Sequence, residues 1–237
     1  MTLLTICTDA ADEIGIPQPA TIINNSDPSV LQLLRSANRE GKTLLKYHWE
    51  VLKKEGSVTS LAAESQGLLT AIETNFLRIA NDTIYDRTSK FKIFGPLTDT
   101  QWQRLKASTA SGVRHYFRIR GGSLLILPQM ISGHAVFFEY FSKNWVDIGT
   151  GATPAVADGS AFNNDANTVV FDEELMSMGV VWRFLKGKGL PYTEKKNEYL
   201  EYRRDLLTQD GAKATINMTG GIYEGWFANV PEITKII

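Results

Sequence analysis

Three acidic residues near the N-terminus, Asp9, Asp12 and Glu13, have types and a spacing that could serve chemistry. Residues three or four positions apart lie on the same face of a helix, so these carboxylates would be neighbours there. Neighbouring carboxylates can bind a cation or act as acid and base. The same spacing also occurs on any solvated helix face. We favour that interpretation, because no second acidic cluster with a catalytic context follows.

The three histidines and the single cysteine form no recognisable site. His48, His115 and His134 fall in one predicted helix and two predicted strand segments, at spacings that match no metal signature. We expect structural or surface roles for them, as is common for partly buried histidine. Cys7 can form no internal disulfide, and nothing near it in the sequence is typical of an activated thiol.

The glycine motifs indicate neither a cofactor nor a nucleophile. The segments GTGA at Gly149 and GKG at Gly187 lack the flanking strand and helix, and the spacing, of a phosphate-binding loop. No Gly-x-Ser-x-Gly motif occurs. The acidic segment FDEEL, which begins at Phe171, is explained by the positive end of a helix dipole. We therefore expect no cofactor, no metal and no catalytic residue set.

Composition places the chain among folded proteins without a strong overall charge. The hydrophobic content is 43%, enough for a sizeable core, and 25 Lys and Arg balance 26 Asp and Glu. This balance disfavours general nucleic-acid binding, which depends on counterion release from phosphates. The chain starts with neither a basic leader nor a cleavage site, and it has no apolar run of about 18 residues. We expect cytosolic synthesis, without a signal peptide or a membrane span.

Helical periodicity predicts two helices in residues 1–55. The first covers Leu3 to Ile14 and ends at Gly15. The second has Asp27 as its cap and Pro28 at its first position, and we predict that it runs to Glu55. Its predicted inner stripe consists of Leu31, Leu34, Gly41, Leu45, Trp49 and Leu52.

Residues 56–149 are typical of a central β region. The segment SVTSLAAESQGLLT predicts two short strands around a polar turn, and TIYDRT, FKIFG and HAVFFEYFS predict further strands. One helical insert is expected after Thr98 or Asp99, with Trp102 and Leu105 on its buried side. The paired glycines Gly121-Gly122 between HYFRIR and SLLILP predict a β-hairpin, because both turn positions can take positive φ.

The rest of the chain predicts an exposed loop, two helices and a tail. Residues 150–170 are small and polar, as is typical of a loop. Residues 171–211 predict one helix capped by Asp172 and a last helix from Tyr192 to Asp210. The predicted inner stripes are Leu175, Met178, Trp182 and Leu185, then Tyr199, Tyr202 and Leu206. The fold class is α+β, with the helices of both chain ends in one bundle and a central antiparallel sheet or sandwich.

The last 26 residues, 212–237, lack helical periodicity, and we predict an extended tail. Unlike a disordered end, this tail is rich in large apolar side chains. These are Ile216, Met218, Ile222, Tyr223, Trp226, Phe227 and Val230. The tail either packs back on its own domain or docks on a neighbouring subunit or another protein, and we favour docking.

Several short motifs occur in a distinctive order along residues 3–211. They are Ile14, Gly15, Pro17 and Pro19 after the first helix; YDRTS from Tyr85 to Ser89; GPL from Gly95 to Leu97 with Trp102; VVWRFLKGKGLPY; and EYRRDLL. In this order they resemble the head-to-tail adaptor proteins of short-tailed bacteriophages, the tubular tail A group.

The resemblance implies a structural virion protein that is not an enzyme. Members of this family form a ring, usually of twelve copies, beneath the portal protein. The ring connects the portal to the tail nozzle protein and continues the DNA channel. The helical part faces the portal, and the β part projects outward or toward the nozzle. Near-neutral charge would suit a channel through which DNA passes without specific binding, because dense Lys and Arg contacts would retain it.

Within this resemblance, the segment YDRT is a candidate contact between subunits. Tyr85, Asp86, Arg87 and Thr88 place an acid, a fork of donors and an aromatic ring within four positions. The alternative is a β-turn in which Asp86 accepts backbone hydrogen bonds while Arg87 is exposed.

Two other functions remain open for a phage tail protein. A glycan-degrading hydrolase would use paired acids such as Asp9 and Glu13, held about 5 to 10 Å apart in a cleft. A carbohydrate-binding β module would use the aromatic-rich strands.

Overall fold

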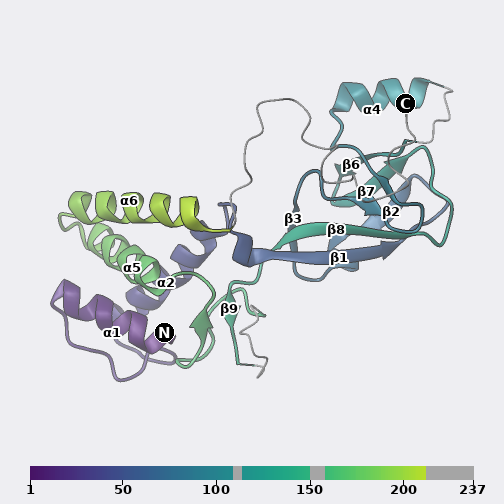
Figure 1. Cartoon of the computed structure of the whole chain (residues 1–237). Coiled ribbons are helices and arrows are strands. Elements are labelled where there is room, and N and C mark those ends of the chain that lie inside the picture. The colour runs from purple at the N-terminus through teal and green to yellow at the C-terminus, as the bar shows by residue number, and fades with distance from the viewer. Residues whose placement is uncertain (109–113, 150–157, 212–237) are drawn as a thin grey trace.

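The computed structural model describes residues 1–108, 114–149 and 158–211, and it divides into two regions (Figure 1). Four helices form the first region, here called the helical lobe: α1 (Leu3–Ile14), α2 (Pro28–Leu44), α5 (Glu173–Lys188) and α6 (Thr193–Gln209). The strands of two antiparallel sheets, with α4 beside them, form the second, here called the β lobe. Strands β1 and β8 extend from the helical lobe into the β lobe. The architecture is mixed, with helices and antiparallel sheets, as the α+β prediction requires.

The two N-terminal helices begin where the sequence predicts. Helix α1 (Leu3–Ile14) is capped by the Thr2 hydroxyl, and it ends at Gly15, whose φ of 78° lets its N–H reach the last carbonyls. Helix α2 (Pro28–Leu44) begins with Asp27, whose carboxylate accepts a hydrogen bond from the Ser29 N–H at 2.7 Å. Capping by the residue just before each helix thus determines where α1 and α2 begin.

The predicted continuation of α2 to Glu55 is wrong. The helix ends at Leu44, and a short 3-10 helix, η1 (Glu50–Leu52), then leads into β1 (Lys53–Thr59), which pairs with β8. The Trp49 indole N–H donates to the Leu44 carbonyl at 3.0 Å. Of the predicted stripe, Gly41 is buried in α2, but the other buried residues of the helix differ from the prediction. They are Val30, Leu33, Ser36, Ala37, Glu40 and Leu44.

Arg78 of the β lobe holds the end of α2. Its guanidinium donates to the carbonyl oxygens of Leu45, Lys46 and Tyr47, the first at 3.0 Å. It also lies 4.5 Å from the centroid of the Phe141 ring. A cation at a helix C-terminus satisfies carbonyls that have no helical partner and favours the dipole. Arg78 therefore ties the β lobe to the segment that follows α2 in the helical lobe.

Helix α5 (Glu173–Lys188) is the central element of the helical lobe. It contacts α1, α2 and α6 (Thr193–Gln209), so it is buried on most sides. Its N-terminus carries the predicted cap, since the Asp172 carboxylate accepts from the Leu175 N–H at 2.9 Å. Gly189, with a φ of 72°, ends the helix and allows the chain to turn into α6.

The described part of the predicted exposed loop, 158–170, is mostly irregular, but it is only partly exposed. Strand β10 (Thr168–Val169) pairs with β9 (Val146–Asp147), and Phe162 and Asn167 are buried. The Asp165 carboxylate accepts from the N–H of Ile23 at 2.7 Å and also from the N–H of Ile22. The Asp165 carboxylate fastens the segment to the helical lobe, so a segment that looks like a free loop in sequence is anchored at Phe162, Asp165 and Asn167.

One sheet of the β lobe has five strands around β8 (Ala135–Ser142). The order is β1-β8-β4-β5, and β3 (Phe76–Ile79) pairs with β8 beyond the end of β4 (Tyr85–Asp86). Strand β5 (Phe91–Lys92) forms one edge and β1 the other. The predicted strands around the SVTSLAAESQGLLT turn exist, but they pair with different partners and not with each other.

The second sheet has three strands in the order β2-β7-β6. Strand β2 (Ser65–Leu68) pairs with β7 (Ser123–Leu127), which forms the predicted hairpin with β6 (Tyr116–Arg120). Both turn glycines, Gly121 and Gly122, have positive φ, which confirms the hairpin prediction. Short helix α3 (Leu69–Ile72) follows β2. Helix α4 (Asp99–Ala107) is the predicted insert, with a complete capping box at Thr98 and a buried Trp102.

Each lobe has its own hydrophobic core. The core of the helical lobe includes Ile6, Leu33, Trp145, Val180 and Tyr199. The core of the β lobe includes Ile84, Phe117, Leu124, Ile126 and Phe138. The predicted docking tail, 212–237, lies outside the described residues. Among the described residues, no helix combines the length and apolar character that crossing a membrane requires.

Candidate functional site

The YDRT segment lies in the β lobe, where β4 turns into β5. Tyr85 and Asp86 form β4 and pair with Phe137 and Val136 of β8. The turn that follows includes Lys90 in the left-handed region, with a φ of 63°. The four predicted contact residues are thus brought together at one place, but their side chains have different environments.

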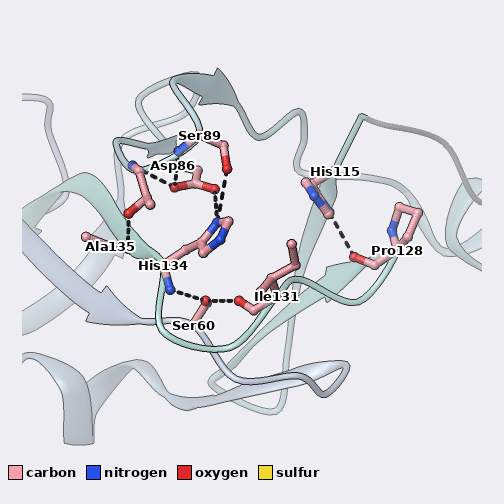
Figure 2. A network of polar contacts seen from close by, with 9 residues as sticks. Ser60, Asp86, Ser89, His115, Pro128, Ile131, His134 and Ala135 are labelled. Atoms are coloured by element: carbon pink, nitrogen blue, oxygen red, sulfur yellow. Dashed lines mark hydrogen bonds and ion pairs between the residues drawn. The ribbon is translucent and has the colours of Figure 1, made fainter.

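Asp86 is buried and is used within the subunit. Its carboxylate accepts from the N–H groups of Thr88 at 2.9 Å and Ser89 at 3.1 Å, which is the turn alternative considered for this segment. His134 Nδ1 lies 2.7 Å from the same carboxylate (Figure 2). Burial alone would raise the pKa of Asp86, but the hydrogen bonds from His134, Ser89 and Thr88 together hold it below the ordinary value.

His134 connects this turn to the loop before β8. Its backbone N–H donates to the Ser60 hydroxyl at 2.9 Å, and Ser60 donates to the Ile131 carbonyl. The neighbouring Ala135 N–H donates to the Thr88 hydroxyl at 2.9 Å. Figure 2 shows these contacts as one chain of hydrogen bonds across the end of β8. The network fixes the position of the β4–β5 turn on the sheet.

The Ser89, His134 and Asp86 side chains have the residue types of a catalytic triad but not its geometry. Ser89 Oγ lies 3.1 Å from Nδ1 of His134, the nitrogen that also contacts Asp86. In a triad the acid and the serine contact opposite nitrogens of the imidazole, so that a proton can pass between them. Here Nδ1 donates its hydrogen to the carboxylate, so it cannot take the proton of Ser89. The arrangement holds the turn and does not activate a nucleophile.

Tyr85 and Arg87 face outward from the same turn. Arg87 is 53% exposed; its guanidinium pairs with Glu55 of β1 and stacks 3.7 Å from the centroid of the Phe137 ring. Tyr85 is 36% exposed and lies opposite Phe137 on β8. These residues line an open groove of about 500 Å³. We call Glu55, Tyr85, Arg87 and Phe137 the sheet surface.

The sheet surface combines charges of both signs with aromatic rings. Glu55 and Glu139 lie directly opposite each other on β1 and β8, an arrangement that disfavours pairing unless a cation is near. Arg87 supplies that cation for Glu55. Nearby, Lys92 pairs with Asp82 at 3.2 Å. Interfaces between proteins are enriched in Tyr, Phe and Arg, so this face has a suitable composition for a wet contact.

The acidic residues considered for acid–base chemistry lie on an exposed helix face. Asp12 accepts from the Gln18 amide at 2.7 and 2.8 Å, and Glu13 pairs with Lys195 at 2.7 Å. Asp9 is exposed. In the described ranges, no group of three or more His, Cys, Asp or Glu residues could hold a metal ion. The placement matches the solvated face that the sequence favours.

The two remaining histidines and the cysteine contact other parts of the fold and show no features of a reactive site. His115 Nδ1 lies 2.9 Å from the Pro128 carbonyl, and His48 stacks edge-on against Phe141. Cys7 is fully buried in the helical core; burial, with a smaller contribution from Asp165, raises the pKa of its thiol to about 12. A thiol with such a pKa is a poor nucleophile at neutral pH.

A buried ionic cluster in the helical lobe was not predicted. Glu40 of α2, fully buried, pairs with Arg183 of α5 and accepts a hydrogen bond from the Tyr199 hydroxyl of α6. Burial, then the charge of Glu40, raises the pKa of Tyr199. Gly179 gives Glu40 its space, because a Cβ there would lie 2.5 Å from Glu40 Cγ. No local sequence pattern indicates this cluster, since its members are 143 and 159 residues from Glu40.

Comparisons with known proteins add no further assignment. No protein-family model matches the chain, and the search of curated proteins gives no match.

Proposed function

We propose that this chain is a head-to-tail adaptor of a phage virion, which binds the portal as a ring and connects it to the tail nozzle. One observation carries the proposal: two lobes with separate cores are joined by strands that run from one into the other. A connector must bind a different partner at each end while keeping the ends in register. Two lobes joined by continuous strands meet that requirement. The order of the sequence motifs, which resembles that of the adaptor family, also supports the proposal.

The connection between the lobes is suited to keep the helical lobe and the β lobe in a fixed orientation relative to each other. Strands β1 and β8 pair over seven residues from Lys53 to Thr59. Arg78 adds a side-chain tie, with its three bonds to carbonyls at the end of α2. Hinges between domains usually have few contacts across the linker. The lobes here are joined by paired strands and by the partly buried guanidinium of Arg78, so we expect them to move together.

We assign the lobes to different partners. The four helices of the helical lobe, as a bundle, would face the portal, and the β lobe would project outward or toward the nozzle. The sheet surface, with exposed Tyr85 and Arg87, would contact a neighbouring copy, while Thr88 and Asp86 hold the turn from within. The tail residues from Ile216 to Val230 remain a prediction for portal docking.

The proposed ring has consequences for DNA passage, for the number of copies and for the place of the protein in the virion. A ring of about twelve copies would continue the channel, and DNA would pass without specific contacts because the whole chain is near neutral. The protein would be made in the host cytoplasm and found in the neck of the virion.

Purified protein mixed with portal rings tests this function directly. We expect a second ring stacked on each portal in electron micrographs, and no turnover of bacterial surface glycans in a parallel assay. Glycan hydrolysis without portal binding would support a hydrolase instead. Truncation after Gly211 would test the tail separately: we expect a folded protein that no longer binds portal rings. Retained binding would assign docking to the lobes.

A further inference from the structure

One side of α2 carries a basic stripe. Its residues are Arg35, Arg39, Lys42 and Lys46, and all four are exposed. The first three lie in α2 and Lys46 lies just beyond its end, where the Lys46 N–H still donates to the Thr43 carbonyl. Spacings of four, three and four residues keep side chains on one face of a helix. The stripe lies opposite the buried face of α2, which includes Leu33, Ala37, Glu40 and Leu44.

One side of α6 carries an acidic stripe with the same spacing. Its residues are Glu194, Glu198, Glu201 and Asp205, again all exposed. The intervals are once more four, three and four residues. The inner side of α6 is formed by Tyr199 with the partly buried Tyr202 and Leu206. The chain therefore has two charged helix faces of opposite sign and equal length.

Among the described residues, these stripes are largely without partners of opposite charge. Across the described ranges, no ion pair involves any of the four basic residues, nor Glu194 or Glu201. Glu198 lies 3.5 Å from Lys195, which binds Glu13 more closely at 2.7 Å. Among the described residues, the one cation within 4 Å of the Asp205 carboxylate is its neighbour Arg204, at 3.9 Å. Exposed pairs of this kind contribute little, so both stripes keep most of their charge available.

The basic stripe is continued by a groove beside it. Arg35 and Arg39 form one wall of an open groove of about 360 Å³, and Arg183 and Lys186 of α5 lie on the other. Arg183 is committed to buried Glu40, but Lys186 has no carboxylate within 4 Å among the described residues. The groove thus adds positive charge to the α2 side of the lobe.

We propose that the basic stripe of α2 in one copy docks on the acidic stripe of α6 in the next copy. This inference rests on the proposed ring and identifies one of its contacts. Two different, complementary faces on one chain make a head-to-tail contact, which closes into a ring when the rotation allows it. The matched charges and spacing favour a second copy over DNA, because DNA would leave the acidic stripe without a partner.

The two middle residues of each stripe can be mutated without knowing whether α2 and α6 of neighbouring copies dock in parallel or antiparallel. Read in reverse, the intervals of four, three and four are unchanged, so Arg39 and Lys42 meet Glu198 and Glu201 in both directions. Variant A is Arg39→Glu with Lys42→Glu, and variant B is Glu198→Lys with Glu201→Lys. Each variant places like charges at every copy of the contact, which opposes association strongly.

The experiment compares wild type, A, B and an equimolar mixture of A and B on portal rings. We expect A and B alone to need at least about tenfold more protein for half-maximal ring formation. The mixture should recover rings that contain A and B in equal number by native mass spectrometry, because alternating copies restore opposite charges at every contact. Arg104→Glu with Arg120→Glu, the same charge change in the β lobe, should assemble normally. Circular dichroism checks that every variant is folded.

Each outcome decides one claim. Normal assembly of A and B would overturn the inference and leave the adaptor function intact. Loss in both variants without recovery in the mixture would also overturn it, because the stripes would then face the portal or DNA. Failure of wild type to bind portals would reject the adaptor function. Sedimentation without portal would then decide the contact by itself: wild-type association lost in A and B and recovered in the mixture supports it, and no association contradicts it.

Discussion

The two lobes hold their buried acids in different ways. In the helical lobe, Glu40 is held by Arg183 and Tyr199, side chains from two other helices. In the β lobe, Asp86 accepts from backbone N–H groups two and three residues away, and His134 is its distant partner among the described contacts. The first cluster joins both ends of the chain, and the second fixes one turn. We therefore expect damage to the first to destabilise the whole lobe and damage to the second to stay local.

Among the variants that test this difference between the lobes, we expect Arg183→Met to lower the free energy of unfolding most. Among the described contacts, it would leave the buried Glu40 carboxylate with only the Tyr199 hydroxyl, and an uncompensated buried charge costs about 3 to 5 kcal/mol. Urea unfolding followed by circular dichroism measures the free energy. Arg35→Met, on the exposed side of α2, is the matched control and should change stability by less than about 0.5 kcal/mol. Equal effects of the two variants would show that the buried cluster does not hold the helices together.

Gly179→Ala tests the packing of α5 around the buried Glu40 side chain. The new Cβ would lie 2.5 Å from Glu40 Cγ, so we expect a loss of about 1 to 3 kcal/mol in the free energy of unfolding. Gly187→Ala in the same helix would meet the end of the flexible Gln32 side chain at the same distance. That control should be neutral or slightly stabilising, because alanine favours helix more than glycine does. Similar results for both glycines would argue against a tightly packed Glu40.

Asp86→Asn tests the local cluster and its dependence on pH. The pKa of Asp86 is lowered in the folded state, so its contribution is present above the ordinary aspartate value and lost as the pH falls through the lowered one. We expect a loss of about 1 to 2 kcal/mol at pH 7, with a shallower acid dependence in the variant. Hydrogen exchange should quicken at residues 85–92 and stay unchanged in α5. Faster exchange in both lobes would contradict a local role.

Arg87→Ala should have the smallest effect on the isolated protein. Arg87 is 53% exposed, and surface ion pairs of this kind contribute about 0 to 1 kcal/mol. Thermal melting should therefore change little. Ring assembly on the portal should weaken, because the sheet surface would lose its guanidinium from between Glu55 and Phe137. Unchanged fold together with unchanged assembly would remove the sheet surface from the interface.

Local sequence signals predicted those features that depend on neighbouring residues. The caps at Asp27, Thr98 and Asp172 lie where a side chain reaches N–H groups two or three positions away. The glycine stop at Gly15 and the Gly121-Gly122 hairpin depend on backbone conformations that glycine allows. Each of these is determined within a few residues, so spacing alone was enough.

Features that depend on distant residues were missed. The segment after α2 contacts Arg78, more than 30 residues further along the chain, and periodicity alone cannot show that the helix ends before this contact. His134 meets Asp86 across 48 residues, and no spacing rule connects them. Residues 158–170 look polar, yet Asp165 and Asn167 use that polarity to bind the backbone of the helical lobe and of their own segment.

Cryo-electron microscopy of the full chain bound to portal rings tests the connector role most directly. We expect a closed ring of copies in which the helical lobes contact the portal and the β lobes point away from it, with the two lobes oriented as in the isolated chain. Particles of bare portal beside free monomers at saturating protein, or a ring attached through the β lobes, would contradict it.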